Sequence, residues 1–184
     1  MALYLNSVED FSEGQKITAI AEHRWFPAYC HPNKERMFYD FAKRYDISCY
    51  VPEIPKYRVT RNRKITTFVP MFTGYVFCCT TRQQNWQLKQ SKYLIRMLNV
   101  SEEDEVRLVN ELNTVRIYER LALTQDVEVR PEMTPGKRVT ITHGSLQGLE
   151  GIIKRRKNAC EVIVELQFIG CSLATVEVDE LELT

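Results

Sequence analysis

The sequence predicts an α+β fold, in which an antiparallel sheet flanked by helices is followed by a small β-barrel. Three observations carry this prediction. The first half alternates short β-branched and aromatic segments with stretches of helical period. A proline-containing stretch with little apolar content begins near residue 124. After it, glycines and an asparagine separate four short apolar segments, a spacing typical of a small barrel that closes its edges.

The first half is expected to open with a strand and a helix. Residues 24–29 are predicted to form the strand. A His-Pro-Asn stretch at 31–33 then ends the strand and marks the position where a helix is expected to begin. Asp46 is expected to end this helix. Its apolar face should consist of four residues at helical spacing, Met37, Phe38, Phe41 and Tyr45.

A strand, an arm and a further strand are expected next. Residues 47–51 form a short strand that is closed by prolines. Residues 56–67 hold five basic side chains and only three apolar side chains to bury, which predicts a projecting arm or hairpin. Residues 67–80 form the central strand region, buried over 76–79. Within it, Gly74 lets the backbone bend or approach a partner closely.

Two helices separated by a strand should complete the first half. Trp86 and Leu88 are expected to anchor the first of these helices, and residues 93–98 form the strand. Ser101 with the three acids after it fits an N-cap, because negative charge is favourable in the first turn of a helix. One face of this last helix should comprise Val106, Val109, Leu112 and Val115.

The strands of the second half are short and closely spaced. Glycines at 144, 148, 151 and 170 and an asparagine at 158 supply the turns between them. The expected strands cover residues 137–141, 149–154, 159–166 and 171–178. The last two are rich in β-branched residues, which lose side-chain freedom in a helix, so we expect this half to be β-structured permanently.

Composition limits the classes of function. The chain has 184 residues, of which 44% are apolar and 27% charged, which suits a soluble protein of one large or two small domains. The net charge of +1 means that nucleic-acid binding would have to come from local patches. No apolar run approaches the roughly 20 residues of a membrane span. Residues 1–15 lack the pattern of a signal peptide, so a cytoplasmic location is expected.

The six cysteines predict neither a metal site nor disulfides. Cys78 and Cys79 are adjacent in a strand and therefore point to opposite faces. The other four show no C-x-x-C spacing, and the three histidines are scattered. We expect buried thiols that behave as small apolar groups, no metal and no cofactor. Since the sequence also lacks a phosphate-binding loop and a recognisable nucleophile–base set, no enzymatic activity is expected.

Two motifs, taken with their order along the chain, resemble the NusG family of transcription elongation factors. Phe72-Thr73-Gly74-Tyr75 follows the basic arm, and residues 136–151, GKRVTITHGSLQGLEG, resemble a KOW motif. The resemblance extends from about residue 23 to the end. It implies an N-terminal extension at 1–20, a NusG N-terminal-type domain at 21–123, a linker at 124–134 and an SH3-like KOW domain at 135–184.

The chain also departs from the family pattern. Thr73 stands where the family usually has proline, and Phe26-Pro27 replaces a more typical tyrosine–aliphatic pair. The region after Leu98 is short and lacks the glycine-rich insertion of housekeeping members. These departures favour a specialised paralogue, of the kind represented by RfaH and by regulators of polysaccharide gene clusters.

The resemblance implies a monomeric factor that binds the clamp helices of RNA polymerase and increases transcription processivity. Operon-specific antitermination is the specialised form of this activity. An apolar depression formed by Tyr29, Phe72 and Tyr75 would make the contact, since aromatic rings give a large contact area at low entropy cost. Without the resemblance, burial tendencies would assign these rings to the core.

Basic residues are the expected contacts to the DNA of the transcription bubble, either the non-template strand or the upstream duplex. The alternative is that they form a solvated loop and helix face. These residues are Lys34, Arg36, Arg58, Arg61, Arg63 and Lys64.

The KOW loop is the expected site for a further partner, either a ribosomal protein or a termination factor. Its residues are His143, Gly144, Ser145 and Leu146. A KOW motif also occurs in ribosomal proteins, so a KOW-type RNA-binding or ribosome-associated protein is the alternative function.

Overall fold

The computed structural model describes residues 16–60, 63–124, 127–130, 138–140, 148, 150–156, 159–166 and 171–178. The chain forms two compact units, Met1–Asn110 and Glu111–Thr184. The division between them falls inside one long helix, α3 (Glu102–Leu121). The predicted KOW loop at 143–146 lies outside the described residues.

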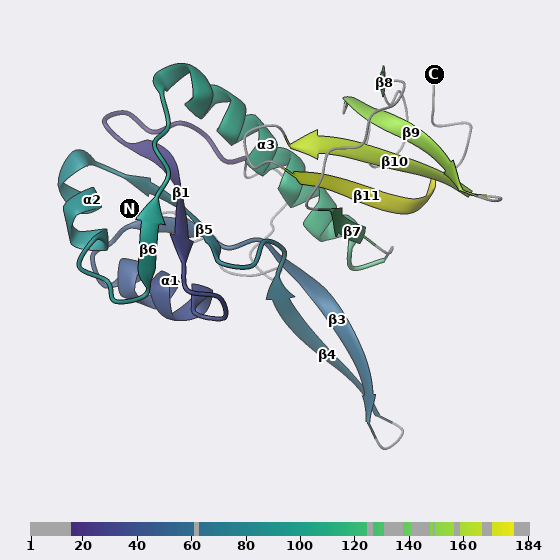
Figure 1. The fold of residues 1–184 in the computed structure, drawn as a ribbon, viewed down its shortest axis with the longest axis horizontal. Coiled ribbons are helices and arrows are strands. Elements are labelled where there is room, and N and C mark those ends of the chain that lie inside the picture. Colours follow the sequence, from purple (N-terminus) through teal and green to yellow (C-terminus); the bar gives the residue numbers. More distant parts are fainter. Residues whose placement is uncertain are drawn as a thin grey trace. The chain divides into compact units, whose positions relative to one another are not determined.

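The first unit contains six strands and two complete helices within the described part of the chain (Figure 1). In chain order these are β1 (Arg24–Cys30), α1 (Glu35–Lys43), β2 (Ser48–Tyr50), β3 (Glu53–Thr60), β4 (Arg63–Pro70), β5 (Tyr75–Thr80), α2 (Arg82–Leu88) and β6 (Leu94–Met97).

Four of these strands form an antiparallel sheet with the order β2-β5-β1-β6. The other two, β3 and β4, form a separate two-stranded ribbon that projects from the sheet (Figure 1). The predicted α+β class and the predicted arm are both confirmed, and the arm is longer than the sequence indicated because pairing continues to Glu53 and Pro70.

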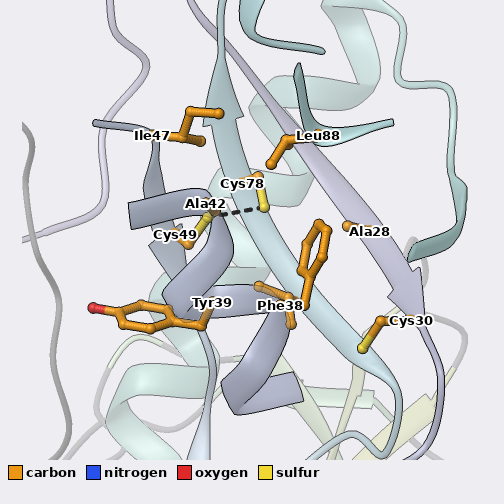
Figure 2. Packing of buried hydrophobic residues seen from close by; sticks show 10 residues of the cluster. Ala28, Cys30, Phe38, Tyr39, Ala42, Ile47, Cys49, Cys78 and Leu88 are labelled. Atoms are coloured by element: carbon orange, nitrogen blue, oxygen red, sulfur yellow. Dashed lines mark hydrogen bonds between the residues drawn. The ribbon is translucent and has the colours of Figure 1, made fainter. Parts of the chain in front are cut away.

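The core of the first unit lies where α1 and α2 cover one face of the sheet (Figure 2). Phe38, Tyr39 and Ala42 of α1 are buried there. The predicted apolar face of this helix is therefore wrong in part, since Met37 is 46% exposed and Tyr45 41% exposed. The buried stripe includes a polar residue, Glu35, whose inward position the apolar pattern alone could not reveal.

The short helix α2 is held by a capping box and by one apolar residue. The Thr81 hydroxyl accepts a hydrogen bond from the Gln84 N–H, and the Gln84 side chain accepts one from the Thr81 N–H. Leu88 is fully buried, as predicted. Trp86, the other predicted anchor, is 66% exposed. A helix this short presents little of its surface to the core.

Helix α3 begins at the predicted N-cap, where the Ser101 hydroxyl accepts a hydrogen bond from the Asp104 N–H. Its acidic first turn also binds β1: Arg24 pairs with Glu102 at 2.6 Å, and Glu105 accepts a hydrogen bond from the Trp25 N–H. Glu105 thus takes the inward position. The predicted apolar face is rotated accordingly, because Val106 is 65% exposed while Leu108, Leu112 and Val115 are fully buried.

Five of the six cysteines have described side chains, and all five are buried free thiols. Cys49 and Cys78 lie opposite each other in β2 and β5, with their Sγ atoms 3.0 Å apart (Figure 2). Burial raises the pKa of Cys30 and Cys79 to about 12, which keeps these thiols protonated at neutral pH. Within the described residues, no helix is long and apolar enough to cross a membrane.

The turn before β5 is fixed by a buried carboxyl group. Oε1 of Glu35, which is 3% exposed, accepts hydrogen bonds from the N–H of Gly74 at 2.6 Å and of Asn33 at 3.3 Å. The Gly74 carbonyl in turn accepts a hydrogen bond from Cys30 of β1 at 2.7 Å. The close approach expected at Gly74 is therefore an approach to the chain's own first strand.

The second unit carries a five-stranded antiparallel sheet with the order β7-β11-β10-β9-β8. Leu166, Cys171 and Leu173 are buried in it. Residues of the stretch predicted as a linker form β7, which pairs with the last strand. The strands are β7 (Val127–Arg130), β8 (Arg138–Thr140), β9 (Glu150–Arg156), β10 (Ala159–Leu166) and β11 (Cys171–Val178).

Gly74→Ala should destabilise the first unit strongly. Gly74 has φ +83°, and a Cβ atom there would lie 2.8 Å from Cε2 of Tyr29 and 3.1 Å from the Cys30 carbonyl. The left-handed conformation costs roughly 1–2 kcal/mol for a residue with a side chain, and overpacking adds about 1–3 kcal/mol. Urea unfolding monitored on the first unit measures the loss.

Gly148→Ala is the matched control, because Gly148 has φ +85° but no atom within 4 Å of its added Cβ. It should cost its own unit only the conformational part, roughly 1–2 kcal/mol. Equal losses for the two variants would mean that close packing at Gly74 does not constrain the fold.

Candidate functional site

A row of three side chains crosses the sheet from β5 through β1 to β6. Tyr29 lies opposite Tyr75 in one strand pair and opposite Arg96 in the other, so the three share one face of the sheet. The two tyrosine rings are 5.1 Å apart at a 50° tilt, and the Arg96 guanidinium lies 5.7 Å from the Tyr29 ring centroid. Both tyrosines are half-buried and Arg96 is exposed.

Arg96 belongs to this row although sequence reasoning missed it. The strand at 93–98 was predicted, but its neighbour in the sheet was not, and only the register with β1 places Arg96 beside Tyr29. A cation over an aromatic ring gains roughly 0.5–1 kcal/mol at an exposed site. This contact restrains the orientation of both the Tyr29 ring and the Arg96 guanidinium.

Phe72, the third aromatic of the predicted depression, is positioned differently. It is only 7% exposed, and its ring packs edge-on against Phe77 of β5 with centroids 6.2 Å apart. Its carbonyl accepts a hydrogen bond from the Tyr75 N–H at 3.1 Å. Phe72 therefore supports the turn that presents Tyr75 and offers little surface of its own.

The basic ribbon has both faces exposed over most of its length. Lys56, Arg58 and Arg63 are exposed. Arg61 lies outside the described residues, and Lys64 is placed in β4 by its pairing with Val59, without a description of its side chain. The structure thus presents at least three cations on one projecting element.

Two predicted nucleic-acid contacts lie near α1 rather than on the ribbon. Lys34 is exposed directly before the helix. Arg36 is also exposed, and its Nη1 atom lies 3.4 Å from a Glu53 carboxyl oxygen at the start of β3. Burial raises the pKa of Glu53, and the positive charge of Arg36 opposes this rise. Arg36 therefore links α1 to the base of the ribbon.

Charge along the chain is more asymmetric than the net value suggests. No Asp or Glu occurs between Glu53 and Glu102, so the positive charge of this span is not offset within it. This signal was present in the sequence, but the net charge concealed it. The nine basic residues of the span are Lys56, Arg58, Arg61, Arg63, Lys64, Arg82, Lys89, Lys92 and Arg96.

Metal chemistry finds no support in the described part of the chain, where no three His, Cys, Asp or Glu side chains gather closely enough to hold an ion. The described part of the chain presents two candidate surfaces. One is the Tyr75–Tyr29–Arg96 row on the sheet, and the other is the basic ribbon.

Comparison with known proteins identifies the family of this chain. The family model described as "Transcription termination factor nusG" matches residues 23–117. No curated protein sequence matches significantly. Among solved structures, the chain is similar to Thermotoga maritima NusG, in a structure described as "Domain interaction in Thermotoga maritima NusG". The identity is 16%, the alignment covers 88% of this chain and 96% of that one, and the TM-score is 0.47.

The chain also resembles conformation A of the MjSpt4:Spt5 complex, with 14% identity, coverage of 87% of this chain and 96% of that one, and a TM-score of 0.27. The family match covers β1 to α3, which includes the aromatic row and the ribbon. This protein therefore belongs to the NusG family, whose members are non-enzymatic transcription factors.

Proposed function

We propose that this protein is an elongation factor that binds the clamp helices of RNA polymerase through its N-terminal domain, residues 21–123, and increases processivity. The observation that carries the proposal is the Tyr75–Tyr29–Arg96 row. It presents two aromatic rings and a cation together on one sheet face, within the part of the chain that matches the NusG family.

The chemistry of the row suits a protein partner. A half-buried tyrosine combines a rigid apolar ring with a hydroxyl group, so it gains contact area and hydrogen bonding at little entropy cost. Tyrosine and arginine are also enriched among the residues that dominate binding energy. Phe72 is buried and contributes indirectly, because it packs against Phe77 and its carbonyl accepts a hydrogen bond from the Tyr75 N–H.

Contact with the DNA of the transcription bubble is the second part of the proposal. Arg58 and Arg63 on the ribbon would meet phosphates of the non-template strand or of the upstream duplex. Lys34 and Arg36 would extend this contact at the start of α1. Arg36 would then have to exchange its ion pair with Glu53 for a phosphate.

The remaining parts of the proposal concern regulation. Operon-specific antitermination, as in RfaH-type paralogues, accounts for the departures of this sequence from the housekeeping pattern. The KOW domain, residues 135–184, would recruit a ribosomal protein or a termination factor through its loop at 143–146. The factor is proposed to act as a monomer in the cytoplasm.

Replacing both Tyr29 and Tyr75 by alanine should abolish retention of the full chain on immobilised core RNA polymerase. Each central aromatic of an interface typically contributes about 2 kcal/mol or more, so the double change lies well outside experimental error. Tyr45→Ala is the control, since Tyr45 is a tyrosine that is 41% exposed but lies after α1 and outside the row.

Wild-type retention by the double variant would overturn the assignment of the row. Circular dichroism must show that the variant is folded for either result to count. Co-sedimentation of the wild-type chain with ribosomes but not with polymerase would instead favour the alternative function of a ribosome-associated KOW protein.

Replacing Arg58 and Arg63 by glutamine should weaken binding to a transcription-bubble complex in a salt-dependent manner and leave retention on core polymerase unchanged. Each lost phosphate contact lowers the slope of log K against log salt by about 0.7–0.9. The slope is measured from binding titrations at several salt concentrations. An unchanged slope would mean that the ribbon is a solvated arm and does not contact DNA.

A further inference from the structure

Two cysteine side chains meet in the core of the first unit. Cys49 of β2 lies directly opposite Cys78 of β5, and their Sγ atoms are 3.0 Å apart (Figure 2). The two residues are 29 positions apart in the sequence, so the spacing of the cysteines gave no sign of this contact. Only the pairing of β2 with β5 brings the two thiols together.

The geometry of this pair suits a disulfide bond. The Cα atoms of directly opposite residues in an antiparallel pair are about 4.5–5.5 Å apart, which lies within the roughly 4.4–6.8 Å that disulfides span. An S–S bond is about 2.0 Å long, so the two sulfur atoms have to approach each other by about 1 Å. Rotation of the two side chains provides this approach without a shift of either strand.

The register favours this pair over the other cysteines with described side chains. Cys79 is adjacent to Cys78, but it points to the opposite face of the sheet and pairs with Ser48. Cys30 lies on β1, four residues from the residue that faces Cys78. A further buried cysteine belongs to the second unit. Oxidation of the folded chain should therefore join Cys49 to Cys78.

The surroundings of the pair decide when it can react. Cys49 is 3% exposed and Cys78 fully buried. Burial, together with the contact to the Cys49 thiol, raises the pKa of Cys78 well above its usual value, so little reactive thiolate is present while the core is closed. The strand β2 has only three residues and lies at the edge of the sheet. Short edge elements open locally more readily than central strands, which gives an oxidant access.

We infer that Cys49 and Cys78 form a reversible oxidation site, at which a peroxide converts the two thiols into a disulfide bond between β2 and β5. Disulfides in cytosolic proteins are typically transient and serve catalysis or redox sensing, which suits a buried pair that is reduced in the folded chain. The oxidation is independent of the proposed function, because it requires neither polymerase nor DNA.

The reaction with hydrogen peroxide has two steps. The thiolate of one cysteine attacks a peroxide oxygen, and the O–O bond breaks to give a sulfenic acid and a hydroxide ion, which takes up the proton lost by that thiol. The thiolate of the second cysteine then attacks the sulfenic sulfur. The S–S bond forms as the S–O bond breaks, and the departing hydroxide takes up the second proton. Each sulfur loses one electron, and the peroxide is reduced to two water molecules.

The disulfide closes a loop that contains the whole β3–β4 ribbon and the turn at Gly74. A covalent link between the ends of this loop restricts the unfolded chain, so the folded first unit is stabilised relative to it. Oxidation thus fastens the edge strand β2 to β5 at the base of the ribbon.

The test compares the reduced full chain with the full chain after treatment with hydrogen peroxide. Digestion without reductant, followed by mass spectrometry, should yield a peptide pair joined through Cys49 and Cys78 and lighter than the two reduced peptides by two hydrogen atoms. Dithiothreitol should restore the separate peptides. Urea titration of the first unit should show that oxidation lowers the unfolding equilibrium constant by about 30-fold or more, the effect typical of a disulfide.

Three variants complete the experiment. Cys49→Ala and Cys78→Ala should each abolish the cross-linked peptide and the change in urea stability on oxidation. Cys79→Ala is the matched control, because it removes a buried thiol next to Cys78 that faces Ser48 and no cysteine. This variant should keep both the cross-link and the stabilisation.

The peptide map of the wild-type chain decides the matter even if a variant fails to fold. Free Cys49 and Cys78 thiols after prolonged exposure to peroxide would overturn the inference, as would oxidation of either one to a sulfinic acid without a cross-link. A cross-link that appears only in the urea-unfolded chain would also contradict it, since the pairing of β2 with β5 would then not direct the reaction.

Discussion

The hydrogen bond from the Gly74 N–H to the buried carboxyl group of Glu35 is the interaction on which both candidate surfaces depend. It joins the first turn of α1 to the turn that leads from the ribbon into β5. Leaving a buried N–H group without an acceptor costs roughly 1–3 kcal/mol of folding free energy. Loss of this hydrogen bond would therefore destabilise the turn. The positive φ of Gly74 and the contact of its backbone with Tyr29 then leave no room for a side chain. Tyr75 follows directly, and its position beside Tyr29 is a consequence of this turn.

The ribbon and the aromatic row are therefore mechanically connected. The ribbon is closed at its base by a hydrogen bond from the Met71 N–H to the Pro52 carbonyl at 2.7 Å, and Arg36 of α1 lies against Glu53 at the same end. Only four residues, 71–74, separate the end of β4 from the start of β5. This geometry suits the proposed role, in which polymerase is bound while a DNA strand is contacted.

Much of the fold could be predicted because local patterns and their physical causes agree. The N-cap at Ser101, the buried strand at 76–79 and the projecting basic arm each follow from residue type and spacing, and the structure confirms them. The errors have a common origin. Met37, Trp86 and Val106 are apolar but exposed, while Glu35 and Glu105 are acidic but buried. A prediction from the hydrophobic pattern assigns only apolar residues to the interior. Here two carboxyl groups also point inward, because they accept hydrogen bonds from backbone N–H groups of distant segments.

The sequence by itself determined the fold class, the order of strands and helices in the first unit, the basic character of the arm and the resemblance to the NusG family, because each depends on neighbours in the chain. Only the tertiary structure decided which side chains meet. Arg96 joins Tyr29 because β6 pairs with β1, Phe72 turns inward because Phe77 packs against it, and Cys49 meets Cys78 because of the register of β2 with β5. Pairing between strands is set by long-range contacts, and a shift of one residue would move every side chain to the opposite face.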